Sequence, residues 1–438
     1  MYIKRKILDY LKNTLKKEPA IILIGTRQVG KTTLIKKMED DLRKESKSTL
    51  YFNLELPSSL ELFSAGVEGF LEYLKAQGIS LNSSFSEYIY IFIDEFQYIN
   101  NAGKFLKALI DNFQQIKIVA SGSSSVEIQK SLKESLVGRK RIINIYSLDF
   151  LEFLYFNQIK EAEYFENIKI NQALSPALCS IFAQLFSQFL VWGGMPKVIL
   201  EQDWQERRVL LEEISSSYLQ KDIKGLIGSE NLAAFNKLMI LLAAESSSIM
   251  NLHSLSNILN LSRKELERHF FILDNTFVNY LISPFYANKR KELSKTKKSI
   301  FYDNGIGNYL LKNLSDFNNR MDKGRLLESA VYNEMRKNLI SGMQIYYWRT
   351  QHQTEIDFVL GWDGKMIPLE VKAGPMRKLP HSLASFAHIY NCPFGIVVNN
   401  DNWQETVIGG LKVYFIPAFL SSFIPSWIVN KGYENTIR

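Results

Sequence analysis

The sequence has only two cysteines, and it has no long uninterrupted run of apolar residues. Cys179 and Cys392 lie far apart, so the sequence indicates neither a disulfide framework nor a cysteine-based zinc site. The most apolar stretch, residues 181–195, contains Gln184 and Gln188 and is too short to cross a bilayer. Charged residues near the N-terminus leave no apolar segment for a signal peptide. We therefore expect a cytoplasmic protein with no membrane partner.

Neither sign of charge dominates the composition. The chain has 53 Lys and Arg residues against 45 Asp and Glu residues, which gives a formal net charge of +8. A net charge of this size allows contact with nucleic acid. A mildly basic surface without a nucleic-acid partner explains the same charge equally well. At 438 residues the chain is longer than one hydrophobic core usually serves, so we expect about two to four domains.

The first third of the chain alternates between apolar runs of strand length and helical patterns. Residues 3–17 have the apolar spacing of a helix. The runs that follow are rich in β-branched and aromatic residues, which is typical of strands buried between helices. The predicted strands are residues 20–24, 49–54, 88–93, 116–120 and 141–145. This alternation predicts a parallel α/β sheet.

Residues 25–32 match the phosphate-binding pattern G-x-x-x-x-G-K-[ST], between a predicted strand and a predicted helix. Glycines allow the tight turn that aims backbone N–H groups at a phosphate, and the helix N-terminus adds partial positive charge. We expect Lys31 to reach the β- and γ-phosphates of ATP and Thr32 to bind Mg²⁺. The predicted nucleotide contacts are Gly25, Thr26, Arg27, Gln28, Val29, Gly30, Lys31, Thr32 and Thr33.

Two acids, Asp94 and Glu95, directly follow the predicted strand at residues 88–93. Downstream of a phosphate-binding loop, this pattern predicts that Asp94 helps to hold Mg²⁺. Glu95 is the predicted catalytic base that orients or deprotonates the attacking water. The presence of Glu95 therefore predicts ATP hydrolysis, with Lys31 also in a catalytic role.

Two further polar residues follow or precede later strands of this sheet. Ser121, after the strand at residues 116–120, would contact the γ-phosphate or the water, although a Gly/Ser turn explains it equally well. Arg139, before the strand at residues 141–145, would act as an arginine finger or nucleotide sensor. A solvated basic residue is the other interpretation of Arg139.

The middle of the chain has the pattern of a DNA-binding module. Residues 252–274 resemble a helix-turn-helix, in which Ser262 and Glu265 form a capping box at the start of the second helix. Two alternating segments, residues 278–285 and 299–302, then predict a hairpin, which completes a winged helix. Its predicted tip, residues 288–298, is strongly basic and suits phosphate contact. A protein-binding role and a solvated tip stay open as alternatives.

The last third carries a carboxylate set typical of a metal-dependent nuclease. A predicted helix contains Glu328, and two predicted strands carry Asp357 and the Glu370-Val-Lys372 triplet. A hairpin brings the two strand acids together, and with Glu328 they are the predicted ligands of a second divalent ion, beside a catalytic lysine, Lys372. A solvent-exposed hairpin with alternating charges and a nuclease fold retained only for binding are the alternatives.

Together these features resemble the prokaryotic AAA-type P-loop ATPases that carry a C-terminal domain of unknown function 4143. The resemblance rests on residues 25–32, 93–97, 121–125 and 138–139 and on the C-terminal acids and lysine. It implies an AAA core, a winged helix and a restriction-endonuclease-like PD-(D/E)xK domain. It also implies that Asp357 and Glu370 are metal ligands. No sensor-2 arginine motif can be placed in residues 160–225, which puts a hexameric ring in doubt but leaves other oligomers open.

The predicted domains are an ATPase domain at residues 1–150, a helical lid or linker at 151–230, a winged helix at 231–315 and a nuclease-like α/β domain at 316–438. The predicted function is ATP hydrolysis coupled to DNA binding, with metal-dependent DNA cleavage by the last domain left open. The alternative is a nucleotide-dependent switch that regulates transcription or a protein partner, in which the nuclease-like domain is catalytically silent.

Overall fold

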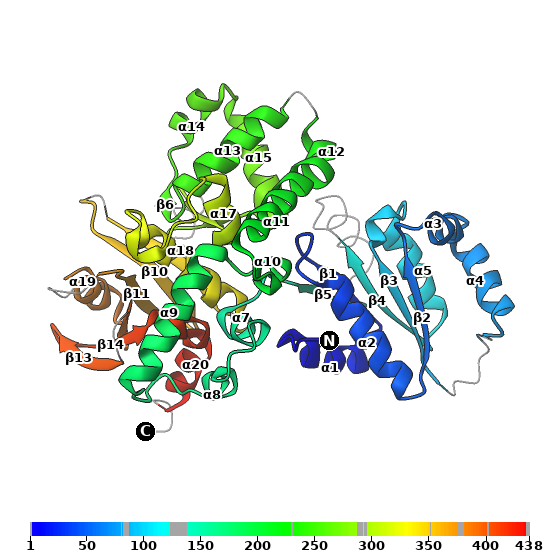
Figure 1. The fold of residues 1–438 in the computed structure, drawn as a ribbon, viewed down its shortest axis with the longest axis horizontal. Coiled ribbons are helices and arrows are strands. Elements are labelled where there is room, and N and C mark those ends of the chain that lie inside the picture. The colour runs from blue at the N-terminus through cyan, green and yellow to red at the C-terminus, as the bar shows by residue number, and fades with distance from the viewer. Residues whose placement is uncertain are drawn as a thin grey trace. The chain divides into compact units, whose positions relative to one another are not determined.

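A computed structural model describes residues 2–79, 81, 87–122, 138–228, 231–286, 292, 296–350, 352–374, 381–400 and 403–434. The chain divides into two compact units (Figure 1). The first unit comprises Met1–Tyr146, Gln220–Leu226 and Asn275–Phe277. The second comprises Ser147–Leu219, Ile227–Asp274 and Val278–Arg438. The three predicted domains after residue 150 lie largely in the second unit, so the four-part division of the sequence stays a prediction.

The first unit is built on a parallel sheet whose five described strands have the order β2-β3-β4-β1-β5. Strand β1 is buried along its whole length, as its run of isoleucine and leucine predicts. The helices of the unit pack beside this sheet (Figure 1). The elements are α1 (Ile7–Lys17), β1 (Ala20–Ile24), α2 (Lys31–Lys44), β2 (Ser48–Asn53), α3 (Pro57–Ser64), α4 (Gly66–Ala76), β3 (Ile89–Asp94), η1 (Phe96–Tyr98), α5 (Ala102–Asn112), β4 (Ile116–Gly122) and β5 (Arg141–Asn144).

The first helix is shorter than its sequence pattern predicts. We expected a helix from residue 3, but α1 begins at Ile7. The reason is tertiary: Arg5 donates hydrogen bonds to the carbonyl oxygens of Val29, at 2.8 Å, and Tyr146, at 2.9 Å. These contacts hold Arg5 against the sheet just before the helix begins, and no local pattern in the sequence indicates them.

The second unit begins with helices, as residues 151–230 predict. Helix α7 starts at a complete capping box, in which the Asp149 carboxylate accepts the Glu152 N–H and the Glu152 carboxylate accepts the Asp149 N–H. The elements are α7 (Phe150–Phe156), α8 (Ala162–Glu166), α9 (Pro176–Trp192), α10 (Pro196–Leu200), α11 (Trp204–Ser217), α13 (Leu232–Ala244), α17 (Asn304–Leu310) and η3 (Phe317–Asn319). The π-helix η2 (Tyr218–Ile223) and helix α12 (Lys224–Ile227), which come between α11 and α13 in the sequence, belong mostly to the first unit.

Two further helices and a small sheet occupy the region where the sequence predicts a helix-turn-helix and a hairpin. The described strands of this sheet have the order β6-β8-β7. Ser262 and Glu265 cap the second helix reciprocally, with N···O distances of 2.8 and 3.3 Å. The elements are β6 (Ser248–Ile249), α14 (Leu252–Leu259), α15 (Arg263–Asn275), β7 (Asn279–Ile282) and β8 (Lys298–Phe301).

The remainder of the second unit is a mixed sheet whose described strands have the order β13-β14-β12-β11-β10-β9. Strands β10 and β11 form the predicted antiparallel hairpin, in which Phe358 pairs with Leu369. Helices α18 and α19 pack against this sheet, through contacts such as Tyr332 with Phe358 and Phe386 with Trp348. The elements are α18 (Lys323–Lys337), β9 (Gln344–Arg349), β10 (Glu355–Trp362), β11 (Lys365–Val371), α19 (His381–Tyr390), β12 (Gly395–Asn399), β13 (Gln404–Ile408), β14 (Leu411–Pro417), η4 (Ala418–Phe423) and α20 (Ile424–Glu434).

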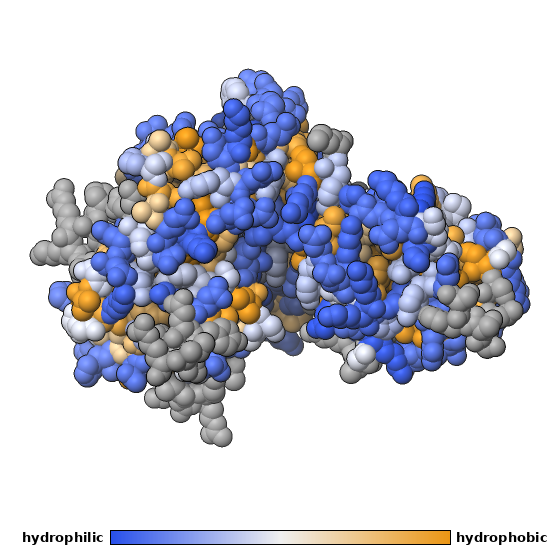
Figure 2. Space-filling view, turned by 90° about the horizontal axis from the view of Figure 1, so that it is seen from below, coloured by the Kyte–Doolittle hydropathy of each residue, from blue (hydrophilic) through white to orange (hydrophobic). Residues whose placement is uncertain are grey.

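The surface shows no extended apolar band on the face drawn in Figure 2, where hydrophobic residues lie in scattered small groups among hydrophilic ones. Among the residues that the structure describes, no helix is both long enough and apolar enough to span a bilayer.

Candidate functional site

The predicted phosphate-binding loop connects β1 to α2 in a conformation that requires its glycines. Gly30 has a φ of +96°, in the left-handed region. At Gly25, an added Cβ would lie 2.2 Å from the carbonyl oxygen of Ile145. Lys31 is only 4% exposed, and its ammonium donates hydrogen bonds of 2.9 Å to the carbonyl oxygens of Gly25 and Thr26. The charge of Lys31 is therefore held inside the loop.

The loop offers the donors that a phosphate group requires. The N-cap of α2 is Gly30, which makes no side-chain cap, and the first N–H groups of the helix follow the loop directly. The Thr26 hydroxyl is buried and has no hydrogen-bond partner among the described residues. These donors, together with Lys31, fit a bound nucleotide phosphate. Thr32 is partly exposed and Thr33 exposed on the first turn of α2.

Asp94 ends strand β3 and is 2% exposed. The Ser121 hydroxyl donates to one of its carboxylate oxygens, and the Tyr51 hydroxyl donates to the other at 3.1 Å. Burial, together with the nearby Asp94 carboxylate, raises the pKa of Tyr51, so this hydroxyl keeps its proton for the hydrogen bond. The Ser121 hydroxyl thus helps to orient Asp94, and its contact with the phosphate or the water stays a prediction.

Glu95 lies directly beyond the strand, in the left-handed region with a φ of +58°. This conformation is uncommon for a residue with a side chain and is often found at functional sites. The side-chain amide of Gln97 donates a hydrogen bond to the Glu95 carboxylate. Because Gln97 fixes one carboxylate oxygen, it is a positioning residue for Glu95. The sequence pattern indicates no role for Gln97, although this residue belongs to the 93–97 segment that carries the family resemblance.

Arg5 is a second residue of this site that the sequence did not indicate. It is 6% exposed, and its guanidinium joins the loop carbonyl of Val29 to the carbonyl of Tyr146, which follows β5. A buried guanidinium with two backbone acceptors fixes the far side of the loop and adds positive charge near it. No local pattern could have identified it, because its partners lie elsewhere in the chain.

Replacing Arg5 by Ala is expected to weaken ATP binding by roughly tenfold, since charge-assisted hydrogen bonds typically contribute about 1.5–3 kcal/mol each and part of this would be lost from the loop. The measurement is the dissociation constant of a fluorescent ATP analogue. The matched control is Arg43→Ala, which removes an arginine of α2 whose partner is Glu39 on the same helix. Equal affinities of the two variants would contradict the role of Arg5.

Arg139 lies at the wrong edge of the sheet for its predicted role. Strand β5 runs parallel to β1, with Ile21 opposite Arg141 and Ile24 opposite Asn144. Arg139 precedes β5, so it lies at the edge opposite to the phosphate-binding loop, where its Nε is 2.8 Å from the Asp111 carboxylate. It therefore cannot act as a finger or sensor on a nucleotide bound by its own chain. Residues 123–125 of the predicted serine segment lie outside the described residues.

In the second unit, the β10–β11 hairpin brings three predicted nuclease residues together. The Asp357 carboxylate accepts the backbone N–H of Val371 at 2.8 Å. Lys372 Nζ lies 2.6 Å from a Glu370 carboxylate oxygen and 3.8 Å from Asp357. The other Glu370 oxygen accepts the Ser382 hydroxyl at 2.8 Å. The strand alternation therefore places these residues side by side as predicted.

Glu328 lies on α18 and faces the same cluster, but its partner is unexpected. The ammonium of Lys298, at the start of β8, forms an ion pair with Glu328 and lies 3.3 Å from Glu355. The sequence placed Lys298 at an exposed basic hairpin tip, whereas its side chain is 1% exposed. The assignment was wrong because composition cannot distinguish a solvated lysine from one buried against carboxylates.

Burial raises the pKa of two acids in this cluster. Burial, with a contribution from the Asp357 charge, raises the pKa of Glu328 to about 8 and that of Glu370 to about 7. Within the described part of the chain, no three His, Cys, Asp or Glu residues are arranged to hold a metal ion. The predicted second divalent ion, with Glu328, Asp357 and Glu370 as its ligands, therefore does not fit this arrangement, in which lysine, serine and backbone donors use the carboxylates.

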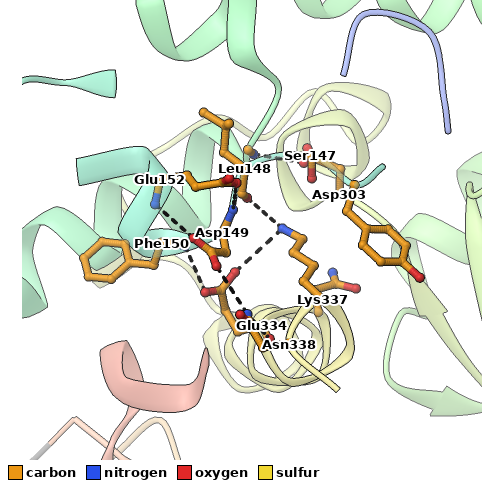
Figure 3. A network of polar contacts seen from close by, with 12 residues as sticks. Ser147, Leu148, Asp149, Phe150, Glu152, Asp303, Glu334, Lys337 and Asn338 are labelled. Carbon is orange, nitrogen blue, oxygen red and sulfur yellow. Dashed lines mark hydrogen bonds and ion pairs between the residues drawn. The ribbon is translucent and has the colours of Figure 1, made fainter. Parts of the chain in front are cut away.

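A buried polar network, which no local sequence pattern indicates, fixes the segment at the start of the second unit (Figure 3). The backbone N–H of Phe150 donates to the Glu334 carboxylate at 2.9 Å. Lys337 Nζ donates to the Leu148 carbonyl at 2.8 Å and lies 3.6 Å from Glu334. Asn338 donates to the Asp149 carboxylate at 3.3 Å. Residues 148–150 are therefore bound to helix α18.

The same segment also contacts the end of the β7–β8 hairpin. The Ser147 N–H donates to the Tyr302 hydroxyl at 2.6 Å. The Leu148 N–H donates to the Gly194 carbonyl at 2.7 Å, and the Gly194 N–H donates to the Asp303 carboxylate at 2.9 Å. Gly194 is required here, because an added Cβ would lie 2.3 Å from the Leu148 oxygen. Residues 147–150 therefore join β8 and α18.

Three family models match successive parts of the chain. An AAA domain matches residues 17–154, a domain of unknown function (DUF8612) residues 183–316, and a domain of unknown function (DUF4143) residues 323–419. An uncharacterized protein of Haemophilus influenzae is 24% identical and aligns over 91% of this chain and 93% of its own length. An uncharacterized protein of Methanocaldococcus jannaschii is also 24% identical and aligns over 78% of this chain and 72% of its own.

Solved structures resemble the chain only distantly. The replication initiator DnaA bound to AMPPCP and single-stranded DNA is 13% identical, with a TM-score of 0.28, and covers 62% of this chain and 90% of its own. C. elegans PCH-2 is 14% identical, with a TM-score of 0.26, and covers 50% of this chain and 62% of its own. Such scores support no functional conclusion. The family matches, in contrast, confirm the resemblance, and the chain joins an AAA-type P-loop ATPase domain to a C-terminal domain of unknown function (DUF4143).

Proposed function

We propose that the chain hydrolyses ATP and that its nucleotide cycle controls binding to DNA. The observation that carries the hydrolysis is the single sheet edge that gathers the required groups. Lys31 is buried inside an uncapped phosphate loop, and Asp94 follows a strand of the same parallel sheet with both its oxygens oriented by hydroxyls. Glu95 follows Asp94 directly.

Each group has a defined task in phosphoryl transfer. Lys31 and the N-terminal N–H groups of α2 bind the β- and γ-phosphates and stabilise their charge. Thr32 and Asp94 would hold Mg²⁺, which when bound neutralises charge on the phosphates. Glu95, positioned by Gln97, orients the attacking water and accepts its proton. Tyr51 and Ser121 keep the Asp94 carboxylate in one orientation.

The proposed DNA contact lies on helix α15. Its apolar side chains, Leu266, Phe270 and Leu273, are buried, whereas Lys264 and Arg268 are exposed on the other side. The succession α13, β6, α14, α15 and a β7–β8 hairpin supports a winged helix, in which the second helix of the pair enters the major groove. The basic residues Lys289, Arg290 and Lys291 of the predicted tip lie outside the described residues.

DNA cleavage is not part of this proposal. The carboxylates that would have to bind a catalytic ion are paired with Lys298 and Lys372. This pairing favours a catalytically silent nuclease-like domain, which is compatible with a nucleotide cycle that controls DNA binding. The second candidate, a nucleotide-dependent switch that regulates transcription or a protein partner, shares both the ATPase cycle and the silent domain.

The test is the salt dependence of duplex DNA binding, measured by fluorescence anisotropy. If Lys264 and Arg268 contact phosphates, the double variant Lys264→Ala/Arg268→Ala is expected to flatten the plot of log affinity against log salt concentration by about 0.9 per lost contact. The matched control, Lys104→Ala/Lys107→Ala, removes two exposed lysines of α5. If Lys264→Ala/Arg268→Ala keeps the wild-type slope of log affinity against log salt concentration, α15 does not contact DNA phosphates, and a protein becomes its expected partner.

A further inference from the structure

The ammonium of Lys298 is buried among the C-terminal carboxylates, although Lys298 belongs to the hairpin outside the β9–β14 sheet. Burying a lysine in its charged form is costly unless acids pair with it. Two acids meet this requirement, because the Lys298 ammonium forms an ion pair with Glu328 and lies 3.3 Å from a carboxylate oxygen of Glu355. The side chain also lies over the ring of Phe358, 5.3 Å from its centre.

The backbone holds Lys298 in this position. Strand β8 pairs with β6 and β7, with Ile249 and Ile282 both opposite Lys298. The chain beyond β7 then joins the edge of the larger sheet: the Phe285 N–H donates to the Tyr347 carbonyl at 2.6 Å. The hairpin is therefore anchored on β9, which lies beside β10 and its residues Glu355 and Asp357.

The charges of the cluster nearly balance without any ion. With all four acids ionised, four carboxylates face three basic groups, which leaves an excess of one negative charge, and the raised pKa values of Glu328 and Glu370 reduce this excess. Their pairings also occupy part of the oxygen set that a divalent ion would need. One oxygen of Glu328, one of Asp357 and both of Glu370 have a polar partner, whereas Mg²⁺ and Mn²⁺ require several free oxygen ligands. The acids are Glu328, Glu355, Asp357 and Glu370, and the bases are Lys298, Lys372 and Arg349.

We infer that Lys298 is the resident cation of this cluster, where it takes the place of a divalent ion and joins the β7–β8 hairpin to helix α18. A divalent ion and the Lys298 ammonium compete for the same carboxylates. The cluster is therefore an ion-paired joint between two elements of the second unit. This role does not depend on ATP hydrolysis or on DNA binding.

The test is a calorimetric titration of the full chain, without nucleotide, with Mn²⁺. Lys298→Met is expected to bind Mn²⁺ at this cluster at least about tenfold more tightly than wild type, since four carboxylates then lack their main counterion. The double variant Lys298→Met/Asp357→Asn removes one ligand of the cluster, so the part of the Mn²⁺ signal that it loses belongs to the cluster. Lys298→Arg, which keeps the charge, and Lys297→Met, which removes the neighbouring lysine, are expected to behave like wild type.

Two results would overturn the inference. One is wild-type protein that binds Mn²⁺ as tightly as Lys298→Met, with binding lost in Asp357→Asn. The other is an equal gain in Lys298→Arg, because the charge would then be irrelevant. Circular dichroism reports whether Lys298→Met folds, and if it does not, the wild-type titration decides: micromolar binding that needs Asp357 overturns the inference, and its absence supports it. ATP turnover, measured separately, tests the proposed function independently.

Discussion

Replacing Glu95 by Gln is expected to reduce ATP turnover by about 10²- to 10⁴-fold while ATP binding is retained. The range is the usual contribution of a positioned general base, because an amide cannot accept the proton of the attacking water. Gln has nearly the same shape as Glu, so it can still occupy the left-handed position at residue 95 beside Gln97. Binding depends on the loop and α2, which the substitution does not touch.

Single-turnover hydrolysis of radiolabelled ATP measures the rate, and titration with a fluorescent analogue measures affinity. Glu72→Gln is a matched control, since it removes an exposed carboxylate on α4 of the same unit. If Glu95→Gln hydrolyses ATP as fast as wild type and Glu72→Gln, Glu95 is not the base. If Glu95→Gln also loses affinity for ATP, the Glu95 carboxylate stabilises the bound ATP as well as the transition state.

The local features of the nucleotide site could be predicted from the sequence, because they depend on neighbours in the chain. Glycine spacing, a strand before the loop and a helix after it place Lys31, and an apolar strand places Asp94. The contacts of Arg5 and Tyr51 could not be predicted, since each joins segments that meet only in the folded sheet. The position of Arg139, in contrast, follows from the predicted parallel sheet, because a residue that precedes a parallel strand lies at the edge opposite to a loop that follows one.

In the C-terminal cluster, too, some positions could be predicted from local sequence patterns and others depend on tertiary contacts. Alternation along two strands and a short turn suffice to predict that Asp357, Glu370 and Lys372 lie together, and they do. Lys298 was misassigned because a run of basic residues suggests a solvated tip. Only the anchoring of the hairpin on β9 buries its last lysine against Glu328. Sequence patterns identify the acids of a site more readily than they identify the cation that balances them.

Replacing Lys31 by Ala is expected to weaken ATP binding by roughly 100-fold, about ten times more than Arg5→Ala. Charge-assisted hydrogen bonds contribute about 1.5–3 kcal/mol each, and a buried ammonium that reaches two phosphates makes more than one of them. In the structure the ammonium is held by the carbonyls of Gly25 and Thr26, so it is already inside the loop before a nucleotide arrives. Little ordering of this side chain then remains for binding to supply.

The same fluorescent titration measures this loss, and Lys44→Ala, an exposed lysine at the other end of α2, is the matched control. The two site variants separate binding from chemistry: Lys31→Ala is expected to lose affinity and turnover together, whereas Glu95→Gln loses turnover alone. Unchanged affinity in Lys31→Ala would mean that backbone N–H groups alone bind the phosphates. In that case the helix N-terminus, and not the lysine, would supply the positive charge of the site.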